Sequence, residues 1–195
     1  KDPTSVPGLS GVTAIATGRW HTCAVAAGGT VHCWGDNEAG QLGVPVDEPY
    51  VPVPVQVPGL RDVTAITAGS FWTCALKSNG TVLCWGANEE GNLGDGTKVD
   101  RSTPEVVPGL AGVTEISAGG WFDGFHTCAV TASGQAWCWG GGTGYGSQQT
   151  TPTLVSGLSG VTEIATTGDH TCVVAEGGGV KCWGRNFYGG LGDGT

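Results

Sequence analysis

The sequence predicts an all-β protein made of four repeated units of short antiparallel strands. Glycine and proline are frequent, at 37 and 10 of 195 residues, and the longest stretch without either runs only from Ser70 to Asn79. Helices are usually recognised from periodic segments of about 8 to 20 residues, so long helices are excluded and short strands joined by turns remain. The second observation is a period, because the cysteines form four pairs whose members are always ten positions apart.

The residues around the cysteines repeat with them, which indicates the domain organisation. Successive first cysteines are 51, 54 and 44 residues apart, and a β-branched segment such as GVTAIATG from Gly11 precedes each pair. We therefore predict a single domain over 1–195. Its repeats lie at about 10–58, 59–108, 109–156 and 157–195. The four cysteine segments are HTCAVAAGGTVHCWG at 21–35, WTCALKSNGTVLCWG at 72–86, HTCAVTASGQAWCWG at 126–140 and HTCVVAEGGGVKCWG at 170–184.

Each unit reads as three strands plus a weaker fourth. The first strand is short and β-branched, typified by Val12 to Thr17. The second and third flank a turn that always has glycine six positions after the first cysteine, such as Gly29, which suits a hairpin loop with positive φ. The fourth lies in a proline-containing linker, as at Val51 to Val57, and prolines confine it to a sheet edge. Several strands are apolar on both faces, which predicts units stacked face to face around an axis.

The cysteine spacing predicts one disulfide in each unit. With an odd-length loop, Cys23 lies directly across from Cys33 on one face of the hairpin, where β-carbons are about 4.5 to 5.5 Å apart. A two-residue loop would place them on opposite faces. Two alternatives stay open, namely buried thiols that pack as apolar residues and metal binding, for which no CxxC spacing occurs. The predicted pairs are Cys23 with Cys33, Cys74 with Cys84, Cys128 with Cys138, and Cys172 with Cys182.

Charge and composition exclude several classes of partner. Eight Lys and Arg against 17 Asp and Glu give a net charge of −9 without any basic cluster, so nucleic acid is not an expected partner. No apolar run approaches the ~18 residues of a membrane span. Disulfides persist in oxidising compartments, which predicts an extracellular, cell-surface or periplasmic location. The chain starts at Lys1 and lacks methionine, so we expect a processed product or an excerpt of something longer.

The sequence predicts no catalytic residue, metal site or cofactor. His21, His126 and His170 share one repeat position, which Trp72 occupies in the second unit. A residue placed identically in every module usually serves the module, so we expect these imidazoles to bond loop backbone. No spacing specifies a nucleophile beside them, and the acidic loops lack the ligand spacing of an EF-hand. We therefore expect a protein that is not an enzyme.

Large aromatic side chains in variable loops are the candidate binding residues. The loops between the first and second strands differ from unit to unit, and aromatic rings at one end of a rigid scaffold suit a protein-binding surface. The alternative is that these rings only cap the sheets. A second class of loop, after the third strand, adds two more rings. The predicted binding residues are Trp20, Phe71, Trp72, Trp121, Phe122, Phe125, Phe187 and Tyr188.

The units resemble the regulator of chromosome condensation repeat family, whose repeats form four-stranded blades of a β-propeller. The resemblance rests on the Gly-x-x-His-Thr segment, the hairpin glycine, the Trp-Gly that closes the third strand, and GDNEAGQLG at 35–43 with GANEEGNLG at 86–94 and GRNFYGGLG at 184–192. The third unit departs from this pattern with GGGTGYGSQ at 140–148. The cysteine pairs make the chain closest in style to secreted bacterial members. Propeller-type inhibitors of β-lactamase in the family look similar in their aromatic loops.

The resemblance implies more blades than four, because the family is similar to seven-bladed rings. We expect the units to belong to a larger ring or to assemble with other copies, with residues 1–9 supplying the outer strand of a closing blade. The predicted function is a non-enzymatic extracellular propeller that binds a protein partner through its aromatic loops or contributes to a surface assembly. One alternative is an exchange factor for a small GTPase, as in nuclear members. Another is a purely structural protein that self-assembles.

Overall fold

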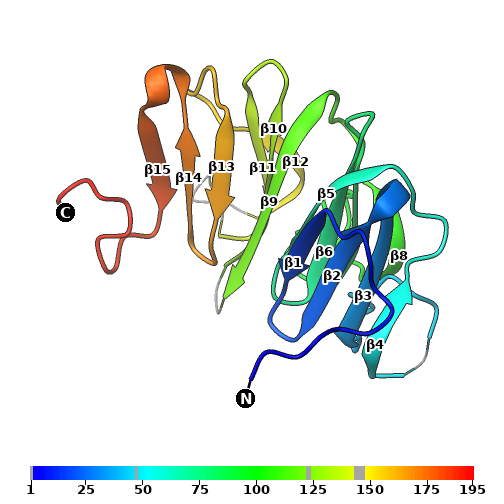
Figure 1. Ribbon diagram of the computed structural model, residues 1–195. Helices are drawn as coiled ribbons and strands as arrows, with labels where there is room; N and C mark the ends of the chain where they lie inside the picture. Colours follow the sequence, from blue (N-terminus) through cyan, green and yellow to red (C-terminus); the bar gives the residue numbers. More distant parts are fainter. Residues whose placement is uncertain (1, 47, 122–123, 143–147) are drawn as a thin grey trace.

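The computed structural model describes residues 2–46, 48–121, 124–142 and 148–195. These residues form four antiparallel sheets, one for each predicted unit, with four, four, four and three strands. The sheets stand side by side in chain order, from the N-terminal sheet at the right of Figure 1 to the C-terminal sheet at the left. The predicted all-β fold of repeated antiparallel sheets is confirmed.

Each sheet is a meander, so strands that are neighbours in space are also neighbours in sequence. The strands are β1 (Ala14–Thr17), β2 (His21–Ala26), β3 (Thr30–Asp36), β4 (Tyr50–Gln56), β5 (Val63–Ala68), β6 (Trp72–Lys77), β7 (Val82–Gly86), β8 (Arg101–Val106), β9 (Val113–Trp121), β10 (Gly124–Thr131), β11 (Ala136–Gly140), β12 (Gln149–Leu154), β13 (Glu163–Thr166), β14 (His170–Val174) and β15 (Val180–Gly184). Two 3₁₀ turns, η1 (Ala27–Gly29) and η2 (Glu176–Gly178), form the β2–β3 and β14–β15 loops.

The hairpin between the second and third strands of each sheet places the cysteines opposite each other. Cys23 pairs with Cys33 in the register of β2 and β3. Gly29 in the intervening turn has a φ of 68°, a conformation that glycine adopts without steric cost. The Cα atoms of each cysteine pair are 4.1 Å apart, and all four predicted pairs are disulfides. No cysteine in the described part of the chain is free.

The apolar core lies between the sheets. Three buried clusters occur, and each joins the second and third strands of one sheet to the first strand of the next. At the first junction, Val25 and Val31 of the first sheet pack in one cluster with Val63, Ile66 and Trp85 of the second. Because a sheet that is apolar on both faces needs a neighbour on each side, this packing explains the two-sided apolar pattern.

The last sheet has three strands, where a unit of four was expected. The first three sheets take their outer strand from a proline-containing linker, and residues 185–195 after β15 contain no strand. Residues 2–13 also form no strand, so the completion of a closing blade by residues 1–9 stays a prediction.

Among the described residues, no helix has the length and apolar character needed to cross a membrane.

Candidate functional site

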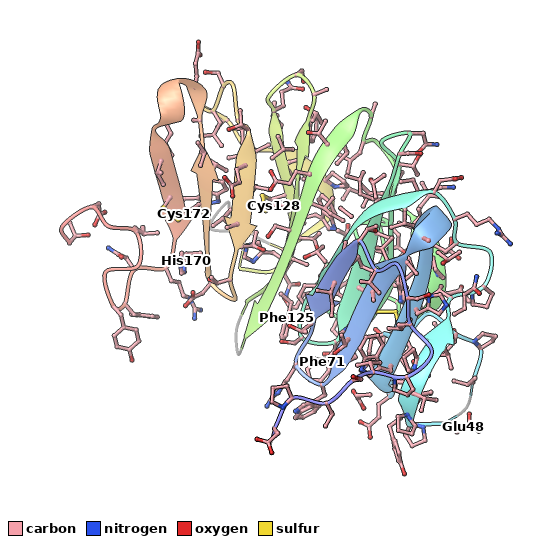
Figure 2. The ribbon with its side chains drawn as sticks, in the orientation of Figure 1. Glu48, Phe71, Phe125, Cys128, His170 and Cys172 are labelled. Atoms are coloured by element: carbon pink, nitrogen blue, oxygen red, sulfur yellow. A yellow bond between two sulfur atoms is a disulfide. The ribbon has the colours of Figure 1, made fainter. Side chains whose placement is uncertain are left out.

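Both classes of variable loop lie at the same end of the sheets. The β1–β2 loop opens β2 at His21, and His21 pairs with Gly35, where β3 leads into the next connection. The same relation recurs in the last sheet, where His170 pairs with Gly184. Figure 2 shows Phe71, Phe125 and His170 along this lower end of the row of sheets. Loop side chains from successive units are therefore presented together.

Two aromatic rings from neighbouring loops contact each other at this end. The ring centroids of Trp20 and Phe71 are 5.6 Å apart with an interplanar angle of 69°, an edge-to-face arrangement. The Arg19 guanidinium carbon lies 4.4 Å from the Trp20 centroid and 5.8 Å from that of Phe71. Trp20 is 59% exposed. The result is an accessible aromatic pair that carries a positive charge.

Hydrogen bonds between the loops fix the position of this pair. The backbone N–H of Arg19 donates to the carbonyl of Ser70 at 3.2 Å. The Ser70 hydroxyl donates to the carbonyl of Gly120 at 2.5 Å, which connects the second loop to the third. A cavity of about 510 Å³ adjoins these contacts and is lined by Thr17, Gly18, Arg19, Trp20, Ala68, Gly69, Ser70 and Gly120. The rings therefore sit on a preorganised surface.

Trp72 was predicted to bind a partner, and that prediction is wrong. Its side chain is 1% exposed, and its indole N–H donates to the hydroxyl of Thr127 at 3.0 Å. Trp72 opens β6 on the side that faces the next sheet, so it packs in the junction. Phe125 is half-buried and meets Trp72 edge-to-face at 5.8 Å. Phe125 contributes to a second hollow that Phe71, Glu89 and Glu90 also line.

The other predicted binding residues do not join this group in the described structure. Phe187 and Tyr188 are highly exposed, at 77% and 101%, but belong to the segment after β15, at the opposite end of the row of sheets. Phe122 lies outside the described residues, as does the side chain of Trp121. We define the aromatic loop face as Arg19, Trp20, Ser70, Phe71 and Phe125.

The histidines that share one repeat position bond the next sheet, in place of the loop backbone that was predicted. Nε2 of His21 lies 2.9 Å from the hydroxyl of Thr73, and Nε2 of His126 lies 2.8 Å from that of Thr171. Both imidazoles are buried between sheets, and this burial lowers the pKa of each to about 4. His170 is the exception, because it bonds Thr167 within its own loop. The physical reason is that the ring of His21 or His126 points across the junction toward the threonine hydroxyl of the next sheet.

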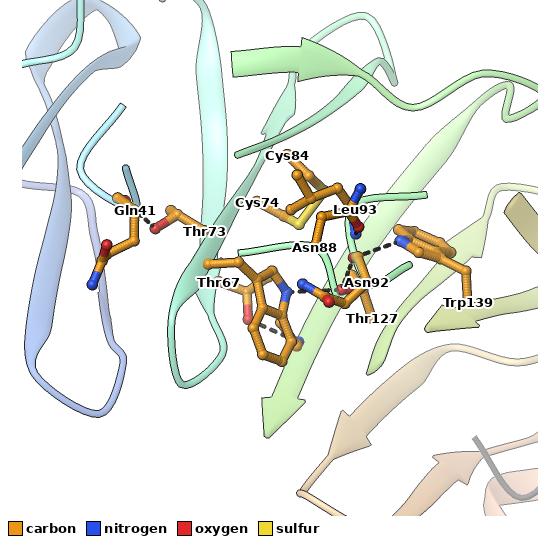
Figure 3. Close-up of a disulfide and its surroundings, with 12 residues drawn as sticks. Gln41, Thr67, Thr73, Cys74, Cys84, Asn88, Asn92, Leu93, Thr127 and Trp139 are labelled. Atoms are coloured by element: carbon orange, nitrogen blue, oxygen red, sulfur yellow. Dashed lines mark hydrogen bonds between the residues drawn. A yellow bond between two sulfur atoms is a disulfide. The ribbon is translucent and has the colours of Figure 1, made fainter. Parts of the chain in front are cut away.

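A backbone carbonyl oxygen of the loop after the third strand completes the first two junctions. The backbone carbonyl oxygen of Gln41 accepts hydrogen bonds from the hydroxyl of Thr73 and the indole N–H of Trp85, each at 2.9 Å. Asn92 accepts from Thr127 and Trp139 at the same distances. Figure 3 shows the bond between Gln41 and Thr73 and that between Asn92 and Trp139, with the Cys74–Cys84 disulfide nearby. This arrangement is structural, and among the described residues no group of three or more His, Cys, Asp or Glu side chains is placed to hold a metal.

Stacked antiparallel sheets with one shared loop end define the class as a propeller-type repeat protein. Two sequence profiles of the regulator of chromosome condensation (RCC1) repeat match the chain, one over residues 28–76 and 79–130 and the other over 12–41, 63–92 and 161–189. The chain therefore belongs to the RCC1 repeat family.

Curated relatives are similar over most of this chain and a small part of their own. The mitochondrial RCC1 domain-containing protein RUG3 of Arabidopsis thaliana is 36% identical over 140 residues, which cover 67% of this chain and 31% of that protein. The E3 ubiquitin-protein ligase HERC2 of Homo sapiens is 35% identical over 127 residues, which cover 63% of this chain and 3% of HERC2. The chain thus spans a third or less of the length of these relatives.

Solved structures share the fold at low sequence identity. The structure of Prp20p from Saccharomyces cerevisiae has a TM-score of 0.81 at 22% identity, and the aligned part covers 97% of this chain and 49% of the Prp20p chain. The structure of human WBSCR16 has a TM-score of 0.80 at 21% identity, and the aligned part covers 94% of this chain and 50% of the WBSCR16 chain. The described chain is therefore a partial propeller, about half the length of these neighbours.

Proposed function

We propose that this chain is a non-enzymatic protein-binding module of an oxidising compartment and that the aromatic loop face is its binding surface. The observation that carries the proposal is the exposed Trp20 ring, held between Arg19 and Phe71 on loops that hydrogen bonds fix in place. Tryptophan, tyrosine and arginine dominate the energetics of protein interfaces because they bury large areas at little entropic cost. A rigid support reduces the ordering cost of association further.

The four disulfides support the choice of compartment, because thiols in the cytosol are kept reduced. The comparisons support protein binding in general terms. In one similar structure yeast RCC1 (Prp20) is bound to Kap60, and Prp20p of Saccharomyces cerevisiae has binding properties toward Gsp1p and histones. The loop residues of the present chain determine which protein it binds, and a capture experiment can identify that protein.

The test compares three immobilised, oxidised proteins: the wild-type chain, Trp20→Ala and Tyr50→Ala. Tyr50 is a matched control because it is an aromatic side chain, 66% exposed, on the outer strand β4. Each protein is incubated with extracellular proteins of the source organism, and the retained proteins are quantified by mass spectrometry. We expect a partner that wild type and Tyr50→Ala retain equally and that Trp20→Ala loses by at least tenfold. Equal retention by all three proteins would contradict the proposal.

A further inference from the structure

The two outermost sheet faces are uncovered, and each lacks the neighbour that every internal face has. The β1–β4 sheet has no sheet before it, and the β13–β15 sheet has none after it, within the described residues. Figure 1 shows these two sheets at opposite ends of the row. Their composition can be compared position by position with the three internal junctions, because all units share one repeat.

The first face exposes side chains whose repeat equivalents are buried. Ile15 is 63% exposed, whereas the isoleucines at the same position of the later units are 9%, 8% and 4% exposed. Val12 is 44% exposed, against 3% to 5% for its equivalents. The equivalents are Ile66, Ile116 and Ile164 for the first position and Val63, Val113 and Val161 for the second. In each later unit the preceding sheet covers them.

The last face likewise exposes side chains whose repeat equivalents are buried, in this case against the following sheet. Val180 is 67% exposed, whereas Val31, Val82 and Ala136 at the same position are at most 1% exposed. Leu191 is half-buried, whereas Leu42 and Leu93 insert into the next sheet and are buried. The loop backbone agrees with this difference. A Cβ on Gly43 or Gly94 would lie 2.7 Å from the indole nitrogen of the next sheet, whereas a Cβ on Gly192 would meet nothing within 4 Å.

The polar groups of a junction are also divided between the two faces. At an internal junction one sheet supplies a ring N–H donor and a loop carbonyl, and the next supplies a threonine hydroxyl and an indole N–H. In the last unit, His170 stands at the position of the ring donor and Gly190 at the position of the loop carbonyl. In the first unit, Thr22 stands at the position of the hydroxyl and Trp34 at the position of the indole. Each face therefore lacks what the other carries.

We propose that the last sheet of one copy docks against the first sheet of a second copy in the same geometry as the three internal junctions. Val180 and Leu191 then cover Ile15 and Val12, and the Gly190 carbonyl accepts from Thr22 and Trp34. Such a contact joins different surfaces of two identical chains, so it either closes into a ring or continues as a filament. The apolar contact rests on Val12, Ile15, Val180 and Leu191, none of which belongs to the aromatic loop face.

Closure is expected with two copies. Two chains of four sheets each reach the upper end of the roughly four to eight blades that are typical of propellers. The present chain covers 49% of the Prp20p structure, so two copies also provide about the length of that neighbour. In such a ring both contacts are identical, and no outer face stays uncovered.

Sedimentation velocity of the oxidised chain tests the proposal. We expect wild type to sediment with twice the 19.6 kDa mass of one chain. Ile15→Asp and Val180→Asp place a carboxylate on opposite faces, at side chains that are exposed in one copy, and each should convert the dimer to a folded monomer. Val106→Asp is the matched control, because Val106 is 55% exposed on the outer strand β8, and it should remain dimeric. Circular dichroism checks that each variant folds.

Mixing the two monomeric variants identifies the geometry of the contact. Ile15→Asp keeps an intact last face and Val180→Asp keeps an intact first face, so an equimolar mixture should regain 1:1 dimers through one contact. Thr22→Val removes only the hydroxyl and should weaken the wild-type dimer by about tenfold per contact. A wild-type chain that stays monomeric up to about millimolar concentration would overturn the proposal, as would a mixture without heterodimer. A continuous series of larger species would overturn the two-copy closure.

Discussion

Nε2 of His21 lies 2.9 Å from the hydroxyl of Thr73, and the same hydroxyl lies 2.9 Å from the carbonyl oxygen of Gln41. A carbonyl can only accept, so the single hydroxyl proton of Thr73 is donated to Gln41. The ring of His21 must then supply the proton of the other bond. This chain of bonds places a hydrogen on Nε2 of His21.

Trp72 supports this assignment because indole is a donor only. It occupies the same repeat position as His21 and His126 and donates to the hydroxyl of Thr127 at 3.0 Å. The position thus requires a ring N–H that donates across the junction, and both histidine and tryptophan meet this requirement. A positive charge is not needed, which agrees with the lowered pKa of both buried histidines.

The first prediction concerns the Thr73 hydroxyl. Thr73→Val keeps the shape of the side chain but leaves a buried ring N–H without an acceptor, which costs about 1–3 kcal/mol of the free energy of unfolding. Thr103→Val changes the same atoms on an exposed position of β8 and should stay within about 0.5 kcal/mol of wild type. Chemical denaturation measures both. Equal stability of the two variants would show that the junction bond contributes nothing.

The second prediction is a loss of stability in acid. The folded pKa of His21 and His126, about 4, lies below the ordinary value of 6.5, so the unfolded chain takes up protons first as the pH falls. The stabilisation is fully present above pH 6.5 and is lost between pH 6.5 and 4. At about 1.4 kcal/mol per pKa unit, each histidine loses about 3 kcal/mol across this window.

Replacement of one histidine separates this loss from that of other titrating groups. His126→Gln keeps an N–H donor but does not ionise, so the difference in unfolding free energy between pH 7 and pH 4 should shrink by about 3 kcal/mol. Long-range ¹H–¹⁵N NMR of the imidazoles should show the Nε2–H tautomer for both wild-type rings. An unchanged pH dependence in His126→Gln, or a ring protonated at pH 6, would contradict the prediction.

The third prediction compares two leucines of the same repeat position. Leu93 is 1% exposed between the second and third sheets, so Leu93→Ala should cost about 2–5 kcal/mol by leaving a cavity. Leu191 is half-buried in the last unit. In the Ile15→Asp background, which leaves the last face uncovered, Leu191→Ala should cost about 1 kcal/mol or less. Similar costs at both positions would mean that the loop, and not the neighbouring sheet, holds the leucine.

The fourth prediction concerns the order in which the disulfides are reduced. Cys172 and Cys182 are half-buried, whereas the cysteines of the other pairs are at most 3% exposed. In monomeric Ile15→Asp, limited reduction followed by alkylation should therefore label Cys172 and Cys182 first. In the wild-type dimer a second copy covers this pair, and its advantage should disappear. Peptide mass mapping measures the order, and early labelling of Cys74 or Cys84 in the monomer would contradict the account.

Local features were predictable because neighbouring residues determine them. The offset of ten between Cys23 and Cys33, with Gly29 in the turn, was enough to set the hairpin register and the disulfide. The partner of the shared histidine was not foreseen, although a signal was present. A threonine follows that position in every unit, as at Thr22 and Thr73. Its meaning emerges only when one sheet is placed against the next.

Phe71 and Trp72 show the same limit for the candidate site. Both are aromatic and adjacent in the chain, yet Phe71 is half-buried on the loop face and Trp72 lies in the core. Successive residues at the start of a strand point to opposite sides, and composition does not say which side another sheet covers. The contact of Trp20 with Phe71 joins two loops 51 positions apart and likewise depends on the stacking.

The amino-acid order by itself determined the four units, their central hairpins and their crosslinks, because each depends on turns and pairings within a few residues. Only the tertiary structure decided which faces are covered. Ile15 and Ile66 hold the same place in the repeat, but Ile15 is exposed and Ile66 is buried, because burial depends on whether another sheet stands next to the residue.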